Sequence, residues 1–207
     1  MKTFTRLLRY FFRLLYHQLA GLYDLVAWIV SLGAWKNWVG STLEFIEGQQ
    51  ILELGPGPGH LQTALFGSGV SPIGIDESKP MLRRASQQIG RKGFRPHLVC
   101  GLAQELPFCS EQFDTVVSTF PAEYITDTRT LSEVRRILKP GGRFVILPWA
   151  IRIETRWLFE VTHQGPSTAF DKLESSLVKS GFKTRTEVLR RRNGTIAIIL
   201  ARKQAAK

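Results

Sequence analysis

The residues Ile51-Leu52-Glu53-Leu54-Gly55-Pro56-Gly57-Pro58-Gly59-His60 decide how this chain folds. An apolar run, typical of a buried strand, contains the acidic Glu53 and is followed by glycines on alternate positions. A helical pattern over residues 61–66 comes directly afterwards. Glycine lets a backbone approach a ligand closely, and a helix N-terminus offers N–H groups without partners. The stretch therefore predicts a strand–loop–helix ligand site, with candidate donors in the amides of Gly57, Gly59 and His60.

The spacing of the glycines separates two classes of nucleotide site. A dinucleotide fingerprint reads G-x-G-x-x-G, whereas this chain reads E-x-G-x-G-x-G, with Glu53 two residues before Gly55. Further along, Pro72 to Asp76 reads as a second strand that ends in an acid. An acid about 20 residues beyond the first glycine of an open α/β sheet accepts hydrogen bonds from ribose hydroxyls. Two plain alternatives stay open, a strand–helix turn without a ligand and an Asp76 that caps the next helix.

The rest of the chain predicts alternating strands and helices. Ser78 predicts a helix cap because its hydroxyl can accept from the first turn, and Lys139-Pro140-Gly141-Gly142 predicts a helix stop. Asn193-Gly194 between two apolar runs is a hairpin signal. We expect strands at 97–101, 113–119, 143–148, 183–190 and 195–203, and helices at 81–89, 128–138 and 168–179.

Two later strings match a known family in the same order. Phe113-Asp114-Thr115-Val116-Val117-Ser118 and Leu138-Lys139-Pro140-Gly141-Gly142-Arg143, with the glycine stretch and Asp76, closely resemble class I S-adenosylmethionine-dependent methyltransferases over about residues 50–150. The small-molecule branch of ubiquinone and menaquinone biosynthesis methyltransferases, with its type 11 domain, is the most similar. The resemblance implies S-adenosylmethionine as cofactor and an α/β, Rossmann-like, doubly wound, seven-stranded sheet, mostly parallel, with a C-terminal antiparallel hairpin and an N-terminal helical appendage.

The resemblance also implies which residues form the two halves of the site. The methyl donor is expected to contact Glu53, Gly55, Gly57, Gly59, Asp76, Glu77, Met81, Ala103, Gln104 and Ser118. The acceptor pocket is expected to include Tyr23, Phe120, Tyr124 and Trp149. The family usually has an acid at the position of Leu102, where it accepts from the adenine amino group. Leucine cannot accept, so Gln104, a backbone carbonyl or a water must do so here.

Methyl transfer requires few catalytic groups from the protein. Methyl transfer from a sulfonium is an in-line displacement in which the donor carries its own leaving group. A base is needed only where the acceptor must lose a proton; Tyr124 and Glu123 are the polar candidates, and the catalytic residue stays unknown because an exposed carboxylate is most often just solvated. Cys100 and Cys109 lack metal-ligand spacing, so we expect no metal and a reducing, cytoplasmic compartment.

The absence of motifs typical of base-methylating enzymes limits the class of methyl acceptor. Base-methylating enzymes of this fold carry a D/N-P-P-Y/F loop, whereas Ser118-Thr119-Phe120-Pro121-Ala122 has one proline and no amide. We therefore expect a small, lipophilic acceptor. The net charge of +11 keeps an RNA methyltransferase open as an alternative, although nucleic acid is disfavoured. A noncatalytic S-adenosylmethionine-binding module and a nicotinamide oxidoreductase also stay open at this point.

The first 47 residues are expected to form a separate helical unit, with the methyltransferase domain over 48–207. Over residues 1–20, basic residues line one helical face and large apolar residues the other, which is typical of a helix in a membrane interface. The protein would then be peripheral to the inner face of an anionic membrane; a lid packed on the domain is the alternative. An uncharged run follows, with an end predicted at Gly33 and Lys36, a core position for Trp38 and a helix cap at Ser41.

Overall fold

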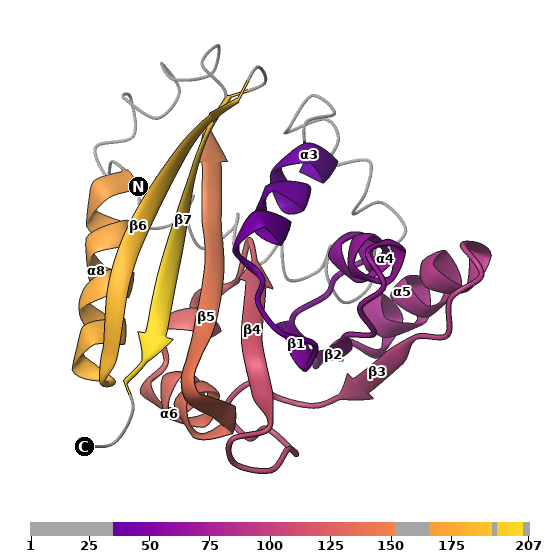
Figure 1. The fold of residues 1–207 in the computed structure, drawn as a ribbon, viewed down its shortest axis with the longest axis horizontal. Helices are drawn as coiled ribbons and strands as arrows, with labels where there is room; N and C mark the ends of the chain where they lie inside the picture. Colours follow the sequence, from indigo (N-terminus) through magenta and orange to yellow (C-terminus); the bar gives the residue numbers. More distant parts are fainter. Residues whose placement is uncertain (1–34, 152–165, 192–193, 205–207) are drawn as a thin grey trace, which may run out of the picture.

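The computed structural model describes residues 35–151, 166–191 and 194–204, and a seven-stranded sheet organises them. The strand order is β3-β2-β1-β4-β5-β7-β6 (Figure 1). All neighbouring strands are parallel except β7, which runs antiparallel to both β5 and β6. The predicted fold class is confirmed. The strands are β1 (Ile51–Leu54), β2 (Ile73–Asp76), β3 (His97–Cys100), β4 (Phe113–Thr119), β5 (Leu138–Ile151), β6 (Phe182–Arg191) and β7 (Gly194–Lys203).

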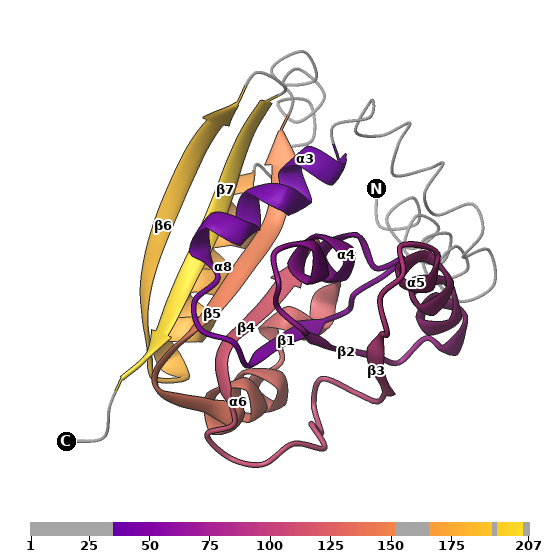
Figure 2. The ribbon, with the colours of Figure 1, turned by 45° about the vertical axis from the view of Figure 1, so that its right-hand side comes forward.

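Helices cover both faces of this sheet. α3 and α4 lie over one face with α5 beside α4, and α6 and α8 lie over the other face (Figures 1 and 2). This is the layering that parallel strands require, because both of their faces are apolar. The helical elements are α3 (Trp35–Gly40), η1 (Ser41–Phe45), α4 (His60–Gly67), α5 (Lys79–Arg91), η2 (Glu123–Thr126), α6 (Thr128–Ile137) and α8 (Pro166–Lys179).

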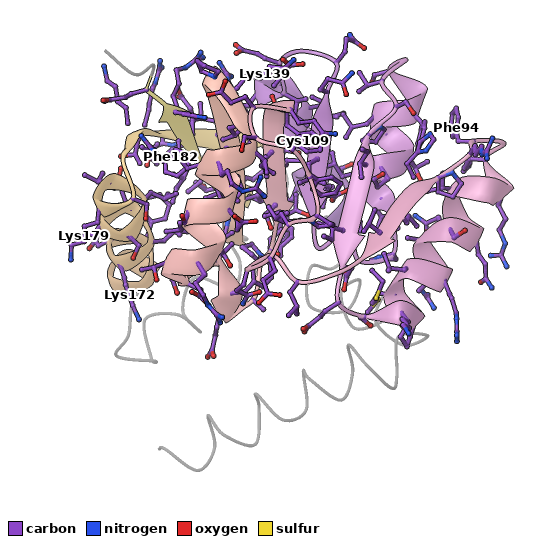
Figure 3. All side chains as sticks on the ribbon, turned by 90° about the horizontal axis from the view of Figure 1, so that it is seen from below. Phe94, Cys109, Lys139, Lys172, Lys179 and Phe182 are labelled. Atoms are coloured by element: carbon purple, nitrogen blue, oxygen red, sulfur yellow. The ribbon has the colours of Figure 1, made fainter. Side chains whose placement is uncertain are left out.

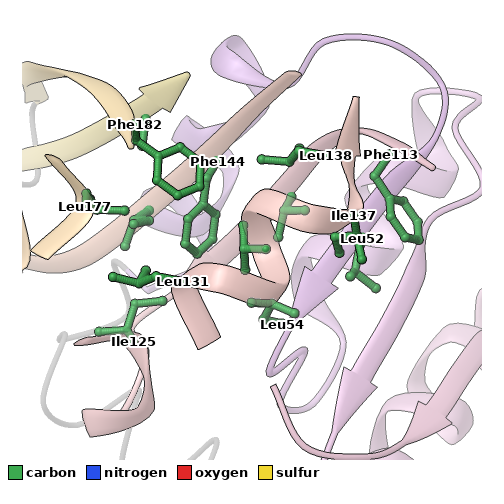
Figure 4. Close-up of a cluster of buried hydrophobic side chains, with 14 of the residues drawn as sticks. Leu52, Leu54, Phe113, Ile125, Leu131, Ile137, Leu138, Phe144, Leu177 and Phe182 are labelled. Atoms are coloured by element: carbon green, nitrogen blue, oxygen red, sulfur yellow. The ribbon is translucent and has the colours of Figure 1, made fainter. Parts of the chain in front are cut away.

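Strand β1 divides its side chains between the two apolar cores. Leu52 and Leu54 pack in the core under α6 and α8, where Figure 4 shows them with Phe144 and neighbours. Ile51 belongs to the other core, with residues of α3 and α4. Because successive strand side chains point to opposite faces, Glu53 shares the face of Ile51. The fold therefore directs an acidic side chain toward α4.

The start of β5 differs from the prediction. The strand begins at Leu138, which pairs with Phe113, and not at Arg143; α6 accordingly ends at Ile137. Leu138 is fully buried, so its burial draws the chain into the sheet immediately after the helix. At Gly142 an added Cβ would lie 3.0 Å from the Asp114 carbonyl oxygen, so a glycine is needed where β5 passes β4.

Two predictions near the start of the described chain are wrong. Lys36 lies inside α3 and does not end a helix. The Ser41 hydroxyl does not cap the following turn but donates to the Asn37 carbonyl oxygen at 3.0 Å, a back-bond that serine readily makes. Trp38 is 5% exposed, as a core position requires. The N-terminal helices expected over 1–34 lie outside the described residues. Small boundary differences elsewhere leave Pro72 and Gly101 just outside β2 and β3.

The carboxylate of Asp114 fastens the start of β1 to β4 and β5. Its Oδ2 accepts from the Gln49 and Gln50 amides at 3.1 and 2.9 Å, and its Oδ1 accepts from Lys139 Nζ at 2.6 Å. Lys139 lies at the same end of the sheet as Cys109 (Figure 3). Burial alone would raise the pKa of Asp114, but these hydrogen bonds outweigh it and lower the pKa. An ionised clamp thus fixes where β1 begins.

Gly48→Ala is expected to destabilise the protein more than Gly141→Ala. Both glycines have positive φ, 79° and 74°, but a methyl group at 48 would lie 2.3 Å from Asp114 Cβ, whereas nothing lies within 4 Å at 141. Left-handed backbone alone costs a non-glycine residue about 1–2 kcal/mol, the expected loss for Gly141→Ala. Displacing the clamp should add about 1–3 kcal/mol for Gly48→Ala. Urea unfolding measures both, and equal losses would contradict the role of the clamp.

Candidate active site

The candidate site lies where the strand order reverses. From β1 the chain moves outward through β2 and β3, then returns to β4 on the other side of β1. Connections that leave β1 and β4 in opposite directions open a crevice at the carboxyl ends of these strands, where open α/β sheets bind ligands. The glycine loop follows β1 at this edge, and the segment 120–122 follows β4.

The three glycines of the loop have different tasks. All have positive φ, 67° at Gly55, 52° at Gly57 and 86° at Gly59. A Cβ on Gly59 would lie 3.2 Å from Ala85, so this glycine lets α5 pack against the loop. At Gly57 a Cβ would meet nothing within 4 Å. The loop therefore presents an open backbone position at Gly57.

Only part of the predicted set of amide donors is available. The Gly59 amide donates to the Pro56 carbonyl oxygen at 2.9 Å, so in this structure it is engaged within the loop. This turn closes the loop on itself. The Gly55 amide donates to Ile75 O at 2.8 Å and joins the loop to β2. Within the described ranges, the Gly57 amide meets no acceptor, so it stays a candidate.

Glu53 is a buried acid of the site whose pKa is strongly raised. It is 1% exposed, and its Oε2 accepts from Gln62 Nε2 of α4 at 2.9 Å. Burial raises its pKa from 4.5 to about 8; the Gln62 hydrogen bond opposes the rise, and the negative charge of Asp76 adds to it. The carboxyl therefore holds its proton at neutral pH while no cation lies beside it.

Asp76 stands at the carboxyl end of β2 and is 3% exposed. Its Oδ1 accepts from the Ser78 amide at 2.8 Å, and Ser78 Oγ accepts from the Met81 amide at 3.4 Å. Ser78 is therefore the cap of α5, as predicted, and Asp76 closes the turn before it. Glu77 is exposed, whereas the Met81 side chain is fully buried under α5. The turn thus holds the Asp76 carboxyl at the crevice.

Behind the loop, two hydroxyls join β4 and η2 to β1. Ser118 Oγ donates to the Leu54 carbonyl oxygen at 3.0 Å, and Tyr124 Oη lies 3.0 Å from Ser118 Oγ and donates to the same carbonyl at 3.3 Å. Ser118 is fully buried. Glu123, the other polar candidate, is exposed on η2. The Tyr124 hydroxyl thus points inward, to the end of β1.

Phe120 and Trp38 form an aromatic pair beside the same edge. Phe120 has a φ of 50°, unusual outside glycine, and its amide donates to the Leu147 carbonyl oxygen at 2.7 Å. Its ring lies 6.5 Å from that of Trp38, centroid to centroid. Strained backbone of this kind persists where surrounding structure imposes it, often at functional sites.

Of the remaining predicted site residues, some contact other parts of the structure and others lie outside the described residues. Ala103 packs against the core, and Gln104 Nε2 donates to Asp127 Oδ2 at 3.5 Å. Leu102 is 45% exposed. Trp149 pairs with Ala197 through the β5 backbone, and its side chain lies outside the described set, as does all of Tyr23. The structure thus gathers Glu53, the loop, Asp76, Ser118 and Tyr124, and leaves the acceptor side incomplete.

Sequence reasoning missed Gln62. It is fully buried on α4, between Leu61 and Leu65, which are also buried. The available signal was a polar residue at a core-facing position of a short apolar helix, nine residues after Glu53. Such a residue needs a buried partner, and Glu53 is that partner.

Metal ligands and membrane spans are both absent from the described ranges. There, no group of three or more His, Cys, Asp or Glu side chains is arranged to hold a metal ion. No helix in the same ranges is long and apolar enough to cross a bilayer.

Fold and site together define a class. A reversal of strand order, a glycine loop with an open position and acids at the ends of adjacent strands are features of α/β proteins that bind nucleosides at the crevice. Within this class, residues 52–146 match the family model described as a methyltransferase domain. This part of the chain is similar to methyltransferase domains, and the predicted resemblance and cofactor are confirmed.

Several relatives carry similar domains. A demethylmenaquinone methyltransferase of Clavibacter sepedonicus is 36% identical over 49% of this chain and 41% of its own length. A phosphatidylethanolamine N-methyltransferase of Cereibacter sphaeroides is 38% identical over 48% and 50%. The chain thus spans about half the length of these relatives or less. The fold matches a putative S-adenosyl-L-methionine-dependent methyltransferase of Methanococcus maripaludis with a TM-score of 0.67, at 20% identity, over 91% and 93% of the two chains.

Glu53→Gln is expected to flatten the pH dependence of stability between the unfolded pKa of 4.5 and the folded pKa of about 8. In this window the native carboxyl keeps a proton that the unfolded chain has lost, so the free energy of unfolding of the wild type falls as pH rises and levels off above it. Glutamine cannot ionise, so the variant should exceed the wild type by a few kcal/mol at the alkaline end, at about 1.4 kcal/mol per pKa unit.

Urea unfolding of the ligand-free protein at a series of pH values measures this difference. Asp114 does not contribute to this difference. Its pKa is lowered from 3.8, so it titrates below the pH range in which Glu53 is expected to act. A parallel fall in the variant would mean that another group titrates there.

Proposed function

We propose that this protein transfers a methyl group from S-adenosylmethionine to a small, lipophilic acceptor. The observation that carries the proposal is one sheet edge that combines the open Gly57 position with two buried carboxyls, Glu53 and Asp76. These features match a ligand with ribose hydroxyls and positive charge. A cationic ligand beside Glu53 would favour the ionised form of this carboxyl, which the neutral Gln62 amide alone does not neutralise.

The chain's residues fit the parts of the donor. We assign the ribose hydroxyls to Asp76, the cationic methionine part to Glu53 and the donor carboxylate to the Gly57 amide. Gln104 is the proposed acceptor for the adenine amino group, since Leu102 cannot accept. When bound, the donor supplies an electrophilic methyl group with its own leaving group. Gly55 and Gly59 shape the loop, and Glu77, Met81, Ala103 and Ser118 complete the proposed donor site.

The acceptor side is aromatic. The half-buried rings of Phe120 and Tyr124 offer apolar surface just after β4, and the buried Trp38 ring lies behind Phe120. The two relatives named above are named for a quinone and a lipid acceptor, which supports a lipophilic acceptor here. Tyr23 and Trp149 stay in the proposed pocket as predictions. Because the Tyr124 hydroxyl is already bonded to Ser118 and Leu54, we propose that Tyr124 positions the acceptor and assign no base.

We place the reaction in the cytoplasm at an anionic membrane face. The support is the alternation of basic and apolar residues over 1–20, which lie outside the described residues, and the lipid named in one relative. Lipophilic acceptors partition into membranes, so a peripheral enzyme would meet them there.

Asp76→Asn is expected to weaken donor binding while preserving the fold. Asparagine Oδ1 can still accept from the Ser78 amide, so the turn before α5 remains, but the charged acceptor is lost. Hydrogen bonds to charged groups contribute about 1.5–3 kcal/mol each, so affinity should fall by roughly one to two orders of magnitude. Calorimetry with S-adenosylmethionine measures the change; unchanged affinity in the folded variant would exclude Asp76 from the ribose contact.

Gly57→Ala is expected to reduce donor affinity more than stability. The new methyl group meets no protein atom within 4 Å, so it enters space that we assign to the donor. Gly93→Ala is the control for backbone strain: Gly93 is exposed where Gly57 is buried, but it has a φ of 82° and likewise no atom within 4 Å of an added Cβ. Both should lose about 1–2 kcal/mol of stability to left-handed strain. Equal donor affinity in the two variants would place the donor elsewhere.

The proposed activity is tested with methyl-labelled S-adenosylmethionine and three acceptor pools: a lipid extract containing quinones, total RNA and a water-soluble metabolite extract. We expect label in the lipid pool, with vesicles of anionic lipid present in a parallel arm. Label in RNA alone would support the alternative function. Donor binding without label in any pool would favour a noncatalytic binding module.

A further inference from the structure

Gln62 is a buried polar side chain to which the reaction gives no task. It is fully buried on α4, and its Nε2 lies 2.9 Å from Glu53 Oε2 and 3.4 Å from the Ile73 carbonyl oxygen. Its Oε1 is also buried and has no hydrogen-bond partner within the described part of the chain. An unpaired buried oxygen costs about 1–3 kcal/mol, so the question is which group could pair with this one.

A glycine on the neighbouring strand, Gly74, lies beside this amide. Glu53 pairs with Gly74 across β1 and β2, so the two residues point to the same face of the sheet. A Cβ on Gly74 would lie 3.4 Å from Gln62 Nε2, 3.1 Å from Pro56 Cγ and 2.8 Å from Leu98 Cδ2. The glycine at 74 thus avoids close contacts with Leu98 and Pro56, and Gln62 Nε2 lies at ordinary contact distance from the same position.

The charges around Glu53 are negative or neutral. Asp76 on β2 acts on it as a like charge, α4 contributes the neutral amide of Gln62, and β4 places Val117 opposite it. Within the described ranges no basic side chain is among the groups that shift its titration. An ionised Glu53 beside Asp76 therefore has no counter-charge from these elements.

An amide suits both protonation states of such an acid. Toward a carboxylate, Gln62 donates through Nε2, the orientation in this structure. Toward a neutral carboxyl, a half-turn of the amide presents Oε1 as the acceptor for the acid proton, at the same distance and with the same shape. That half-turn gives the orphaned Oε1 its partner.

We propose that Gln62 is a positioning residue that follows the protonation state of Glu53, and that this pair releases one proton when the cationic donor binds. The inference rests on the proposed function, because S-adenosylmethionine supplies the positive charge. A cation beside a carboxyl favours its ionised form. The balance is simple: the Glu53 carboxyl loses its proton to solvent, the carboxylate stays beside the donor, and Gln62 turns Nε2 toward it.

Calorimetric titration of the full chain with S-adenosylmethionine, in buffers of different ionisation enthalpy, tests the proton release. The apparent binding enthalpy should depend linearly on buffer ionisation enthalpy, with a slope near one proton released at about pH 7. The slope should approach zero above about pH 9, where free Glu53 is already ionised. Glu53→Gln should remove the slope, and Glu111→Gln, an exposed acid far from the loop, should retain it.

Gln62→Met tests the positioning role, because methionine keeps length and volume but lacks the amide. The carboxylate loses its donor, so donor affinity should fall about tenfold, the equivalent of about 1.4 kcal/mol. The pH at which proton release is half complete should move upward. A loss of stability with an unchanged release profile would overturn the positioning role.

The outcomes separate this inference from the function on which it rests. Saturable binding of S-adenosylmethionine by the wild type with no buffer dependence near neutral pH would overturn proton release and leave the donor site standing. Absence of saturable binding by the folded wild type would overturn the proposed function itself. The wild-type buffer series needs no variant, so it decides the point even where a substitution prevents folding.

Discussion

The burial of two acids at the ends of adjacent parallel strands is the constraint on which this structure depends. Glu53 and Asp76 are 1% and 3% exposed and interact unfavourably when both are charged. Removing charged groups from water costs several kcal/mol unless partners compensate. The Gln62 amide donates to Glu53, and the Ser78 amide donates to Asp76. The Gln62 amide carries no full charge, so it does not neutralise an ionised Glu53.

The residues around the two acids are constrained as well. Gly74 must lack a side chain because a Cβ there would lie 2.8 Å from Leu98 Cδ2 and 3.1 Å from Pro56 Cγ, and Gly59 must lack one so that α5 can pack against the loop. At the opposite end of the sheet, the Asp114 clamp fixes the start of β1. β1 is short, Ile51–Leu54, so fixing one end places the other. The position of the acid pair is thus set from both ends of the strand.

Patterns within a few residues could be predicted from the sequence. The span of β4 and the cap at Ser78 follow from such patterns, and the glycine loop and Asp76 could be assigned to one edge of the sheet. Features set by contacts between distant residues could not be predicted. The early start of β5 depends on Leu138 pairing with Phe113, 25 residues earlier in the chain. The Gly59–Pro56 hydrogen bond and the Gln62–Glu53 pair are closer in sequence, but they depend on how the loop closes and on how α4 packs over β1.

The φ of 50° at Phe120 has a consequence for how this protein could change. Its backbone is held by the Leu147 carbonyl and by the preceding strand β4, whereas its ring lies against Trp38 of α3. The donor loop lies on β1, and its hydrogen bonds do not pass through residue 120. Under the proposed function, a new side chain at this position reshapes the acceptor wall and leaves donor recognition intact. Under the proposed function, single substitutions at residue 120 can therefore change which acceptor is bound during evolution, while the donor site stays the same.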